Sequence, residues 1–431
     1  MTLLSWATRA VAELDVLTSA LLVLGIALVV LVVAERVLRR LPLSPALIYL
    51  TLGWLAGHML GAPSTQALVG DAPTLVVITE LAVLVSLFAV GVRLRVPPTL
   101  RAWAPALLLA GPGMAVTIGL TALLGHWLLD LSLPAAMLLG AILAPTDPVL
   151  ASDVQIRSDT DREPVRTTIT AEGGMNDGTA LPAVMLGLGL LGLHELGDGW
   201  RNWWVYDLLW PIGGGALIGA CGGWALGAVL RWRVRAGDPL MRDELLYVGA
   251  VALCYGTALA LEMSAFVVAF AAGVLLMRPL EKDALAPEAK DLAIRLHAFG
   301  ERCERLIEAA MVLFVGVALH SVTIEATHLL YAATLLLLVR PISVLAVLRG
   351  RLLMNRQRRL VAWFGIRGIG SLFYLAFAME HGVTGTLAHE LLATTLLCVA
   401  LSILLHGVSA TPLMLAHEKG QPPEDAQPPS A

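Results

Sequence analysis

Residues 133–152 read LPAAMLLGAILAPTDPVLAS, an apolar run long enough to cross a membrane that is interrupted by Pro145-Thr146-Asp147-Pro148. Each proline removes a backbone donor and disfavours helix at the residue before it, so we expect the helix to break inside the run. A break at membrane depth is tolerated only where protein or water satisfies its free carbonyl and N–H groups, and such broken helices build cation sites in transporters. The simpler alternative is a proline kink in which Asp147 only caps a helix end.

The composition of the whole chain indicates a membrane protein. Of 431 residues, 58% are hydrophobic and only 14% are charged, whereas soluble globular proteins carry about 25% charged residues. The net charge of −4 gives no sign of a nucleic-acid partner, and the four cysteines show no spacing typical of a disulfide framework or a metal site. The sequence has no G-x-x-x-x-G-K-[ST] motif, so we expect no nucleotide hydrolysis through a P-loop and no cofactor.

We interpret thirteen apolar runs as the spans of an all-α polytopic membrane protein. They are residues 16–38, 43–60, 74–92, 102–125, 133–152, 165–192, 205–230, 244–261, 264–279, 304–321, 325–348, 358–380 and 386–409. The shortest, 264–279, follows its neighbour directly after Glu262 and is the least distinct. Residues 1–415 are thus predicted to form one membrane domain, and residues 416–431 a short disordered tail.

The basic residues give the chain an orientation. Of the 29 lysines and arginines, 25 lie in, or within a few residues of, alternate connections between the spans or in the C-terminal tail, only Arg9 and Arg201 lie on the other side, and Arg340 and Arg367 fall deep inside spans. Because cytoplasmic loops carry an excess of Lys and Arg, this split predicts an external N-terminus and a cytoplasmic C-terminus. The longest polar stretch, about residues 280–303, is predicted to be an amphipathic cytoplasmic linker.

A second group of polar residues, Glu172-Gly173-Gly174-Met175-Asn176-Asp177, lies in the middle of the sixth span. Ionisable residues at this depth are costly and are functional candidates by default. On a helix, Glu172 and Asn176 share a face, whereas Asp177 points about 140° away from Glu172. We expect Gly173 and Gly174 to let the broken fifth span approach closely. A carboxyl group such as that of Asp177 can bind a cation or a proton but not both at once; the alternative for both acids is a structural ion pair with arginine.

Two arginines lie near the middles of later spans, in Val339-Arg340-Pro341 and in Gly365-Ile366-Arg367-Gly368. An arginine at this depth requires a carboxylate or free carbonyl groups, and Glu172 and the carbonyls of the fifth span are the candidates. The glycines around Arg367 predict a second weakened helix. Because spans 5 and 12 are seven apart in a set of thirteen, they run in opposite directions, which fits inverted repeats whose two broken helices cross at mid-membrane.

Taken in order, these pieces resemble the monovalent cation:proton antiporter family, in the branch of the NhaP-like bacterial sodium/proton antiporters and the animal sodium/proton exchangers. The matching pieces are Gly140-Ala141 before Thr146-Asp147-Pro148, Glu172 with Asn176-Asp177, Arg340-Pro341, and Gly365-Ile366-Arg367-Gly368. The resemblance covers nearly the whole membrane region. It implies the NhaA-like antiporter fold and a homodimer, in which a core bundle around spans 5, 6 and 12 moves against a dimerisation bundle.

The same resemblance implies roles for individual residues. Asp177 is expected to bind the ion and the proton, with Asn176 beside it, while Thr146 and Asp147 complete a site for a monovalent cation. Glu172 is expected to form a structural ion pair, which we assign to Arg340, and Arg367 to hold the other broken region.

The residue at position 176 bears on stoichiometry. Asn176 instead of aspartate resembles the branch taken to exchange one cation for one proton, and the three lysines, Lys282, Lys290 and Lys419, all lie outside the spans, as in that branch. In one departure from the family, Gly173 stands where many relatives have a serine, which leaves the cation preference open.

The sequence therefore predicts a secondary active Na⁺(Li⁺)/H⁺ antiporter of a prokaryotic cell membrane. It works by alternating access, exchanges the ions electroneutrally, and binds cation or proton in competition at Asp177. The alternatives left open are a K⁺/H⁺ exchanger or a symporter of the same fold, a channel, and a membrane-embedded enzyme, for which no nucleophile or metal set is visible.

Overall fold

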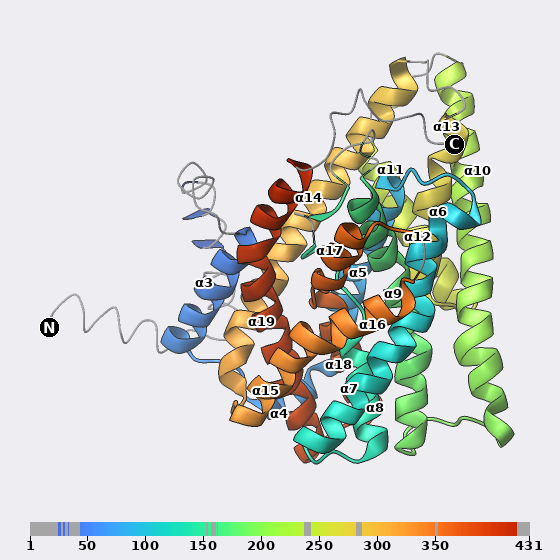
Figure 1. Ribbon diagram of the computed structural model, residues 1–431. Coiled ribbons are helices and arrows are strands. Elements are labelled where there is room, and N and C mark those ends of the chain that lie inside the picture. Colours follow the sequence, from blue (N-terminus) through green and yellow to red (C-terminus); the bar gives the residue numbers. More distant parts are fainter. Residues whose placement is uncertain are drawn as a thin grey trace, which may run out of the picture.

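The computed structural model describes residues 25–26, 29–30, 33, 44–151, 154–156, 161, 163–236, 243–281, 287–349 and 352–419. Helices, joined by turns and short loops, make up this part of the chain, and it contains no strand (Figure 1). The predicted all-α fold is confirmed. Most of the first predicted span, residues 16–38, and all of residues 420–431 lie outside the described residues.

The first half of the described chain runs from α3 to η4. Its elements are α3 (Pro45–Leu60), α4 (Thr65–Gly70), α5 (Ala72–Arg93), α6 (Leu100–Leu108), η1 (Leu109–Gly113), α7 (Met114–Leu128), α8 (Leu133–Leu143), α9 (Pro164–Leu190), η3 (Asp198–Trp200) and η4 (Trp203–Gly214).

The second half runs from α10 to α19. Its elements are α10 (Gly215–Arg235), α11 (Asp243–Ala260), α12 (Ala265–Leu276), α13 (Arg278–Glu281), α14 (Pro287–Ala318), η5 (Leu319–Ser321), α15 (Ala326–Thr334), η6 (Leu335–Val339), α16 (Arg340–Val347), α17 (Asn355–Trp363), α18 (Ile369–Glu380) and α19 (Gly385–Glu418).

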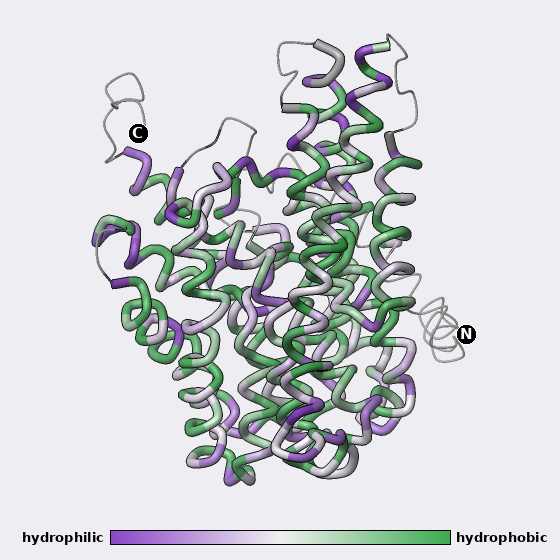
Figure 2. The backbone as a smooth tube through the Cα atoms, turned by 90° about the vertical axis from the view of Figure 1, so that its right-hand side faces the viewer, coloured by the Kyte–Doolittle hydropathy of each residue, from purple (hydrophilic) through white to green (hydrophobic). Residues whose placement is uncertain are grey.

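Each of the other twelve predicted spans coincides with one or more of these helices. The insecure boundary between the eighth and ninth spans is real, because the chain turns at Glu262, whose φ is 53°, and Ser264 then caps the start of α12. Among the residues that the structure describes, five helical stretches are long and apolar enough to cross a membrane by themselves: Ala72–Arg93, Leu100–Leu128, Asp198–Arg235, Ala326–Val347 and Gly385–Glu418. Figure 2 shows hydrophobic residues along the middles of the helices and hydrophilic ones gathered toward the two ends of the molecule.

Two segments are more helical than the sequence predicts. Residues 287–303, expected to belong to a linker, form the first half of α14, which continues without a break to Ala318. Likewise α19 runs to Glu418, so the expected tail begins within a helix. In both segments the helix extends beyond the apolar run, because residues at helical spacing remain buried there: Leu292 and Leu296 in α14, and Ala410, Met414 and His417 in α19.

Candidate functional site

The two predicted helix breaks meet in the centre of the molecule. Helix α8 ends at Leu143, and the chain from Ala144 to Asp147 is not helical; residues 364–368 separate α17 from α18 in the same way. The N–H of Asp147 donates to the carbonyl oxygen of Ile366 at 2.8 Å, which joins one break to the other. The prediction that spans 5 and 12 are both broken and cross is confirmed.

The carboxylate of Asp147 caps the helix that starts at the other break. One oxygen accepts a hydrogen bond from the backbone N–H of Ile369, the first residue of α18, and the second accepts from the N–H of Val149 at 2.6 Å and of Leu150 at 3.1 Å. A carboxylate is favourable here because a helix N-terminus carries partial positive charge. This geometry is that of the cap considered in the sequence analysis, and any contribution of Asp147 to cation binding would be additional to it.

Arg367 donates hydrogen bonds to the free carbonyl groups at the break in the fifth span. Its guanidinium donates to the carbonyl oxygen of Ala144 and, at 2.9 Å, to that of Pro145. The carbonyl of Ala144 has no helical donor because residue 148 is a proline, and that of Pro145 has none because the N–H of Val149 is bonded to Asp147. Its own backbone N–H donates to the hydroxyl of Ser402 on α19 at 2.8 Å. With a relative exposure of 0%, Arg367 is buried completely, so each broken segment supplies the polar partners that the other needs.

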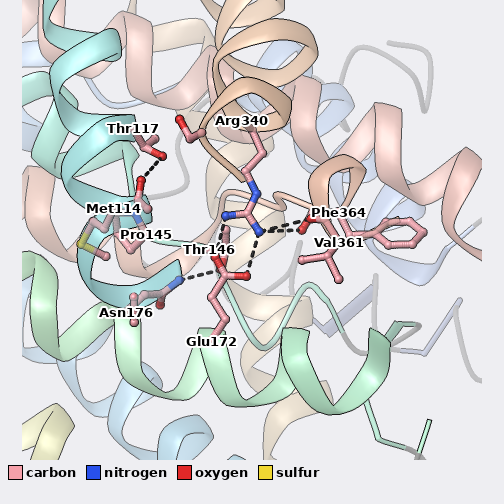
Figure 3. Close-up of polar contacts among 12 residues, drawn as sticks. Met114, Thr117, Pro145, Thr146, Glu172, Asn176, Arg340, Val361 and Phe364 are labelled. Atoms are coloured by element: carbon pink, nitrogen blue, oxygen red, sulfur yellow. Dashed lines mark hydrogen bonds and ion pairs between the residues drawn. The ribbon is translucent and has the colours of Figure 1, made fainter. Parts of the chain in front are cut away.

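Glu172 pairs with Arg340 and not with Arg367. The guanidinium of Arg340 donates to both carboxylate oxygens of Glu172, at 2.5 and 2.8 Å, and lies within 3.5 Å of the carbonyl oxygens of Val361 and Phe364 (Figure 3). Both side chains are buried. A Cβ at Gly365 would lie 2.8 Å from Cδ of Arg340, so only glycine there leaves room for the arginine. The pair therefore ties α9 to α16 and to the end of α17.

Thr146 and Asn176 bring the fifth span next to the sixth. The amide nitrogen of Asn176 donates to the hydroxyl of Thr146 at 2.6 Å (Figure 3). The amide oxygen of Asn176 is buried and has no hydrogen-bond partner among the described residues. These two residues thus leave a polar oxygen available beside Asp177.

Asp177 differs from every other acid in the crossing. Its exposure is only 1%, and neither carboxylate oxygen has a hydrogen-bond partner in the part of the chain that the structure describes. A Cβ on Gly370 would lie 2.6 Å from one of these oxygens, so the carboxylate rests against the first turn of α18. Tyr374 on the same helix donates its hydroxyl to the main-chain carbonyl of Asp177 and fixes the backbone. The carboxylate is therefore positioned but has no protein partner, as a site for an exchangeable ion requires.

The two glycines before Asp177 face different neighbours. A Cβ on Gly173 would lie 3.3 Å from Cβ of Pro148, so Gly173 does permit the close approach of the fifth span. For Gly174 the prediction is wrong: a Cβ there would overlap the ring of Phe270 on α12. The two residues face different segments, the fifth span and α12, because successive residues are about 100° apart around a helix.

A cavity lies on the side where α8 begins and α9 ends, which the basic residues predict to be external. It has a volume of about 200 Å³ and lies between helices α9 and α18 on one side and α5, η4 and α12 on the other. Its acidic lining residues are Glu80, Asp207 and Glu262. Both Glu80 and Glu262 lie near the ends of their spans on the side predicted to be external.

Sequence reasoning missed a second buried ion pair. Arg93 at the end of α5 donates to Glu304 of α14 at 2.5 Å, and the hydroxyl of Ser86 approaches the same oxygen at 3.3 Å. Both charged side chains are less than 10% exposed. The residues fall at the boundaries of predicted spans, where solvated charges are ordinary, so no local signal distinguishes them; only the length of α14 reveals that Glu304 is enclosed.

Comparison with known proteins identifies the family. A family model described as "Sodium/hydrogen exchanger, transmembrane" matches residues 24–416. The chain belongs to this family. The K⁺/H⁺ antiporter NhaP2 of Shewanella sp. (strain MR-4) is 26% identical over 406 residues, which cover 93% of the chain and 67% of the relative. The Na⁺/H⁺ antiporter NhaP of Pseudomonas aeruginosa is 29% identical over 307 residues, 68% of each protein.

Solved structures agree with the fold of this exchanger family. The sodium proton antiporter MjNhaP1 from Methanocaldococcus jannaschii superposes with a TM-score of 0.73 at 20% identity, over 95% of the chain and all of the solved one. A second structure of the same antiporter, at pH 8, gives a TM-score of 0.69. The protein is thus a multi-pass membrane protein of a cation/proton antiporter family with the antiporter fold, and the resemblance noted in its sequence is confirmed.

Proposed function

We propose that this exchanger-family protein is an electroneutral Na⁺(Li⁺)/H⁺ antiporter in which cation and proton compete for the carboxylate of Asp177. The observation that supports the proposal is the contrast between Asp177 and its neighbours. The carboxylates of Glu172 and Asp147 are occupied by Arg340 and by backbone N–H groups, whereas Asp177 alone among these three acids has no partner. A carboxylate so placed is stabilised either by a proton or by a cation.

The residues beside Asp177 supply neutral oxygens. In this proposal the amide oxygen of Asn176 and the hydroxyl of Thr146 complete the cation site together with Asp147 or water; the two side chains are already joined at the crossing through the amide nitrogen of Asn176. Hard monovalent cations prefer such oxygen ligands. Since Asn176 carries no charge, one carboxylate exchanges one cation for one proton, and net charge movement is zero.

Alternating access requires the core helices to move relative to the remainder. We assign α8, α9, α17 and α18 to the moving core and α5, α10, α11, α12 and α14 to the scaffold, which in a homodimer would stay in contact with its copy. The excess of basic residues in alternate connections supports, for a prokaryotic cell membrane, a cytoplasmic C-terminus and an external N-terminus. Transport then uses the gradient of one ion to move the other.

A K⁺/H⁺ exchanger is the second candidate. The K⁺/H⁺ antiporter NhaP2 of Shewanella sp. (strain MR-4) aligns over 93% of the chain, whereas the Na⁺/H⁺ antiporter NhaP of Pseudomonas aeruginosa aligns over 68%. In addition, Gly173 provides no hydroxyl ligand, and fewer ligands at a site suit a larger and more weakly hydrated cation.

Proteoliposomes with an internal pH dye test both candidates. Addition of Na⁺, Li⁺ or K⁺ in turn should release the imposed pH gradient for the transported ions, and a valinomycin clamp should leave an electroneutral rate unchanged. Asp177→Asn should abolish the exchange while the protein remains folded and monodisperse. Exchange by that variant at the wild-type rate would contradict the assignment of Asp177, and gradient release by K⁺ alone would favour the second candidate.

A further inference from the structure

Helix α12 is locked to the scaffold through its main chain. A Cβ on Gly223 of α10 would lie 2.6 Å from Cα of Ala272 in α12. On another side, Gly91 of α5 and Gly273 of α12 face each other so closely that a Cβ on either would lie 3.0 Å from Cα of the other. Backbone contacts of this kind leave no side chains that could rearrange, so α12 cannot slide past α5 or α10.

The side of α12 that faces the core is built in the opposite way. Phe270 and Val267, one turn apart, project from α12 onto two glycines of α9, Gly174 and Gly178. A methyl group on Gly174 would overlap the ring of Phe270, and one on Gly178 would overlap the side chain of Val267. Here large side chains rest on a bare helix surface, directly beside Asp177.

From this asymmetry we infer that α9 shifts along the fixed helix α12 when the core changes its access side, so that the ring of Phe270 passes from Gly174 to Gly178. The two glycines are four residues apart, so they present the same recess on one face of α9 with a separation of about 6 Å. A one-turn shift of a packed element past its neighbour is a known form of conformational switch. The inference rests on the proposed alternating-access function and assigns to Phe270 a positioning role in it.

The residues beyond the two glycines limit the shift to one step. One turn before Gly174 lies Thr170, which is buried and whose hydroxyl accepts the N–H of Ile156 at 3.1 Å. One turn after Gly178 lies Pro182. Neither position offers a recess for an aromatic ring. The ring of Phe270 can therefore pack on α9 at two positions, over Gly174 and over Gly178, and at no third.

The direction of the step agrees with the cavity at the external end. The cavity is lined by Leu181 and Met185 of α9 and by Met263–Phe266 of the scaffold. Moving Gly178 under Phe270 shifts α9 toward its own N-terminus, the predicted cytoplasmic side. The turns after Met185 are then drawn into the cavity, which closes the external side and carries Asp177 inward.

A suppressor experiment tests the inference. Val267→Ala removes the side chain that a methyl on Gly178 would meet, so Val267→Ala/Gly178→Ala is accommodated in the present register, and Val267→Ala alone is its matched control. The added methyl group fills only the recess at Gly178, the second position at which the ring of Phe270 packs. We expect exchange in proteoliposomes to fall about tenfold or more in the double variant. Adding Phe270→Ala, which removes the ring that needs this recess, should restore most of the control rate.

Each outcome decides the inference. Unchanged exchange in the double variant overturns it, and so does a loss that Phe270→Ala does not restore. The cation-induced rise of the melting temperature should persist in the double variant, because its ion site is intact, and should disappear in Asp177→Asn. If Asp177→Asn keeps that rise, the proposed function fails by itself, independently of what the Gly178 variants do.

Discussion

Arg340 donates to both carboxylate oxygens of Glu172, at 2.5 and 2.8 Å, from a position where neither group reaches solvent. A pair of this kind fixes the relative position of two helices, because neither charge can be left buried without the other. It gives the core a rigid reference against which the unpartnered Asp177 is held.

Removing one member of this pair should lower stability more than transport. We expect Glu172→Gln to reduce the free energy of unfolding by about 3 kcal/mol, because it leaves the charge of Arg340 buried without a counter-charge. Thermal unfolding of the purified protein measures this loss. Glu195→Gln, in the exposed segment after α9, is the control, and a melting temperature of Glu172→Gln equal to that control would contradict a structural pair.

Asp147→Ala should behave as the loss of a helix cap. It removes acceptors from the first N–H of α18 and from the turn after Pro148, at a cost of about 1–2 kcal/mol. The melting temperature should still rise on addition of the transported cation, since Asp177 is intact. A variant that is as stable as the wild type but no longer responds to cation would show instead that Asp147 is a ligand.

Arg367→Lys should fail to replace the arginine although the charge is kept. The guanidinium bonds the carbonyl oxygens of Ala144 and Pro145 from one nitrogen and is planar, whereas lysine is shorter and more strongly hydrated. We expect a loss of stability of about 2–3 kcal/mol from the unsatisfied carbonyl groups. Arg356→Lys, on the exposed surface, is the matched control, and equal stability of the two variants would contradict the role of Arg367.

Gly173→Ser should change the cation preference. A Cβ at this position lies 3.3 Å from Cβ of Pro148, a tight contact that the prolyl ring can accommodate by a small shift. Comparison of Gly173→Ser with Gly173→Ala separates the effect of the hydroxyl on cation binding from the effect of the added Cβ, which both variants share. We expect the serine variant to have a KM for Na⁺ severalfold lower than the alanine variant, and equal values in both would exclude the hydroxyl as a ligand.

Most of the fold could be predicted because its signals are local. The prolines around Asp147 and the glycines around Arg367 predict two helix breaks without any knowledge of the tertiary structure. The apolar runs in the same way locate the described spans. The pairing of Glu172 with Arg340 was expected only through the family resemblance, because it depends on rotations of helices that no short motif specifies. The face on which Gly174 lies depends on the same rotations and was predicted wrongly. The pair Arg93–Glu304 was missed because its burial results from a distant helix continuing beyond the apolar run.

The contact between the two broken helices also determines the net formal charge of the crossing. Asp147 and Arg367 cancel in formal charge, as do Glu172 and Arg340, so the crossing carries the single negative charge of Asp177 when it is empty. In the proposed function, binding of a proton or a monovalent cation makes it neutral. Only the unloaded protein would have to carry a net charge through the low-dielectric interior, at a substantial energetic cost. Return of the empty carrier is therefore suppressed, and the same arrangement that neutralises the helix ends protects the ion gradients from leakage.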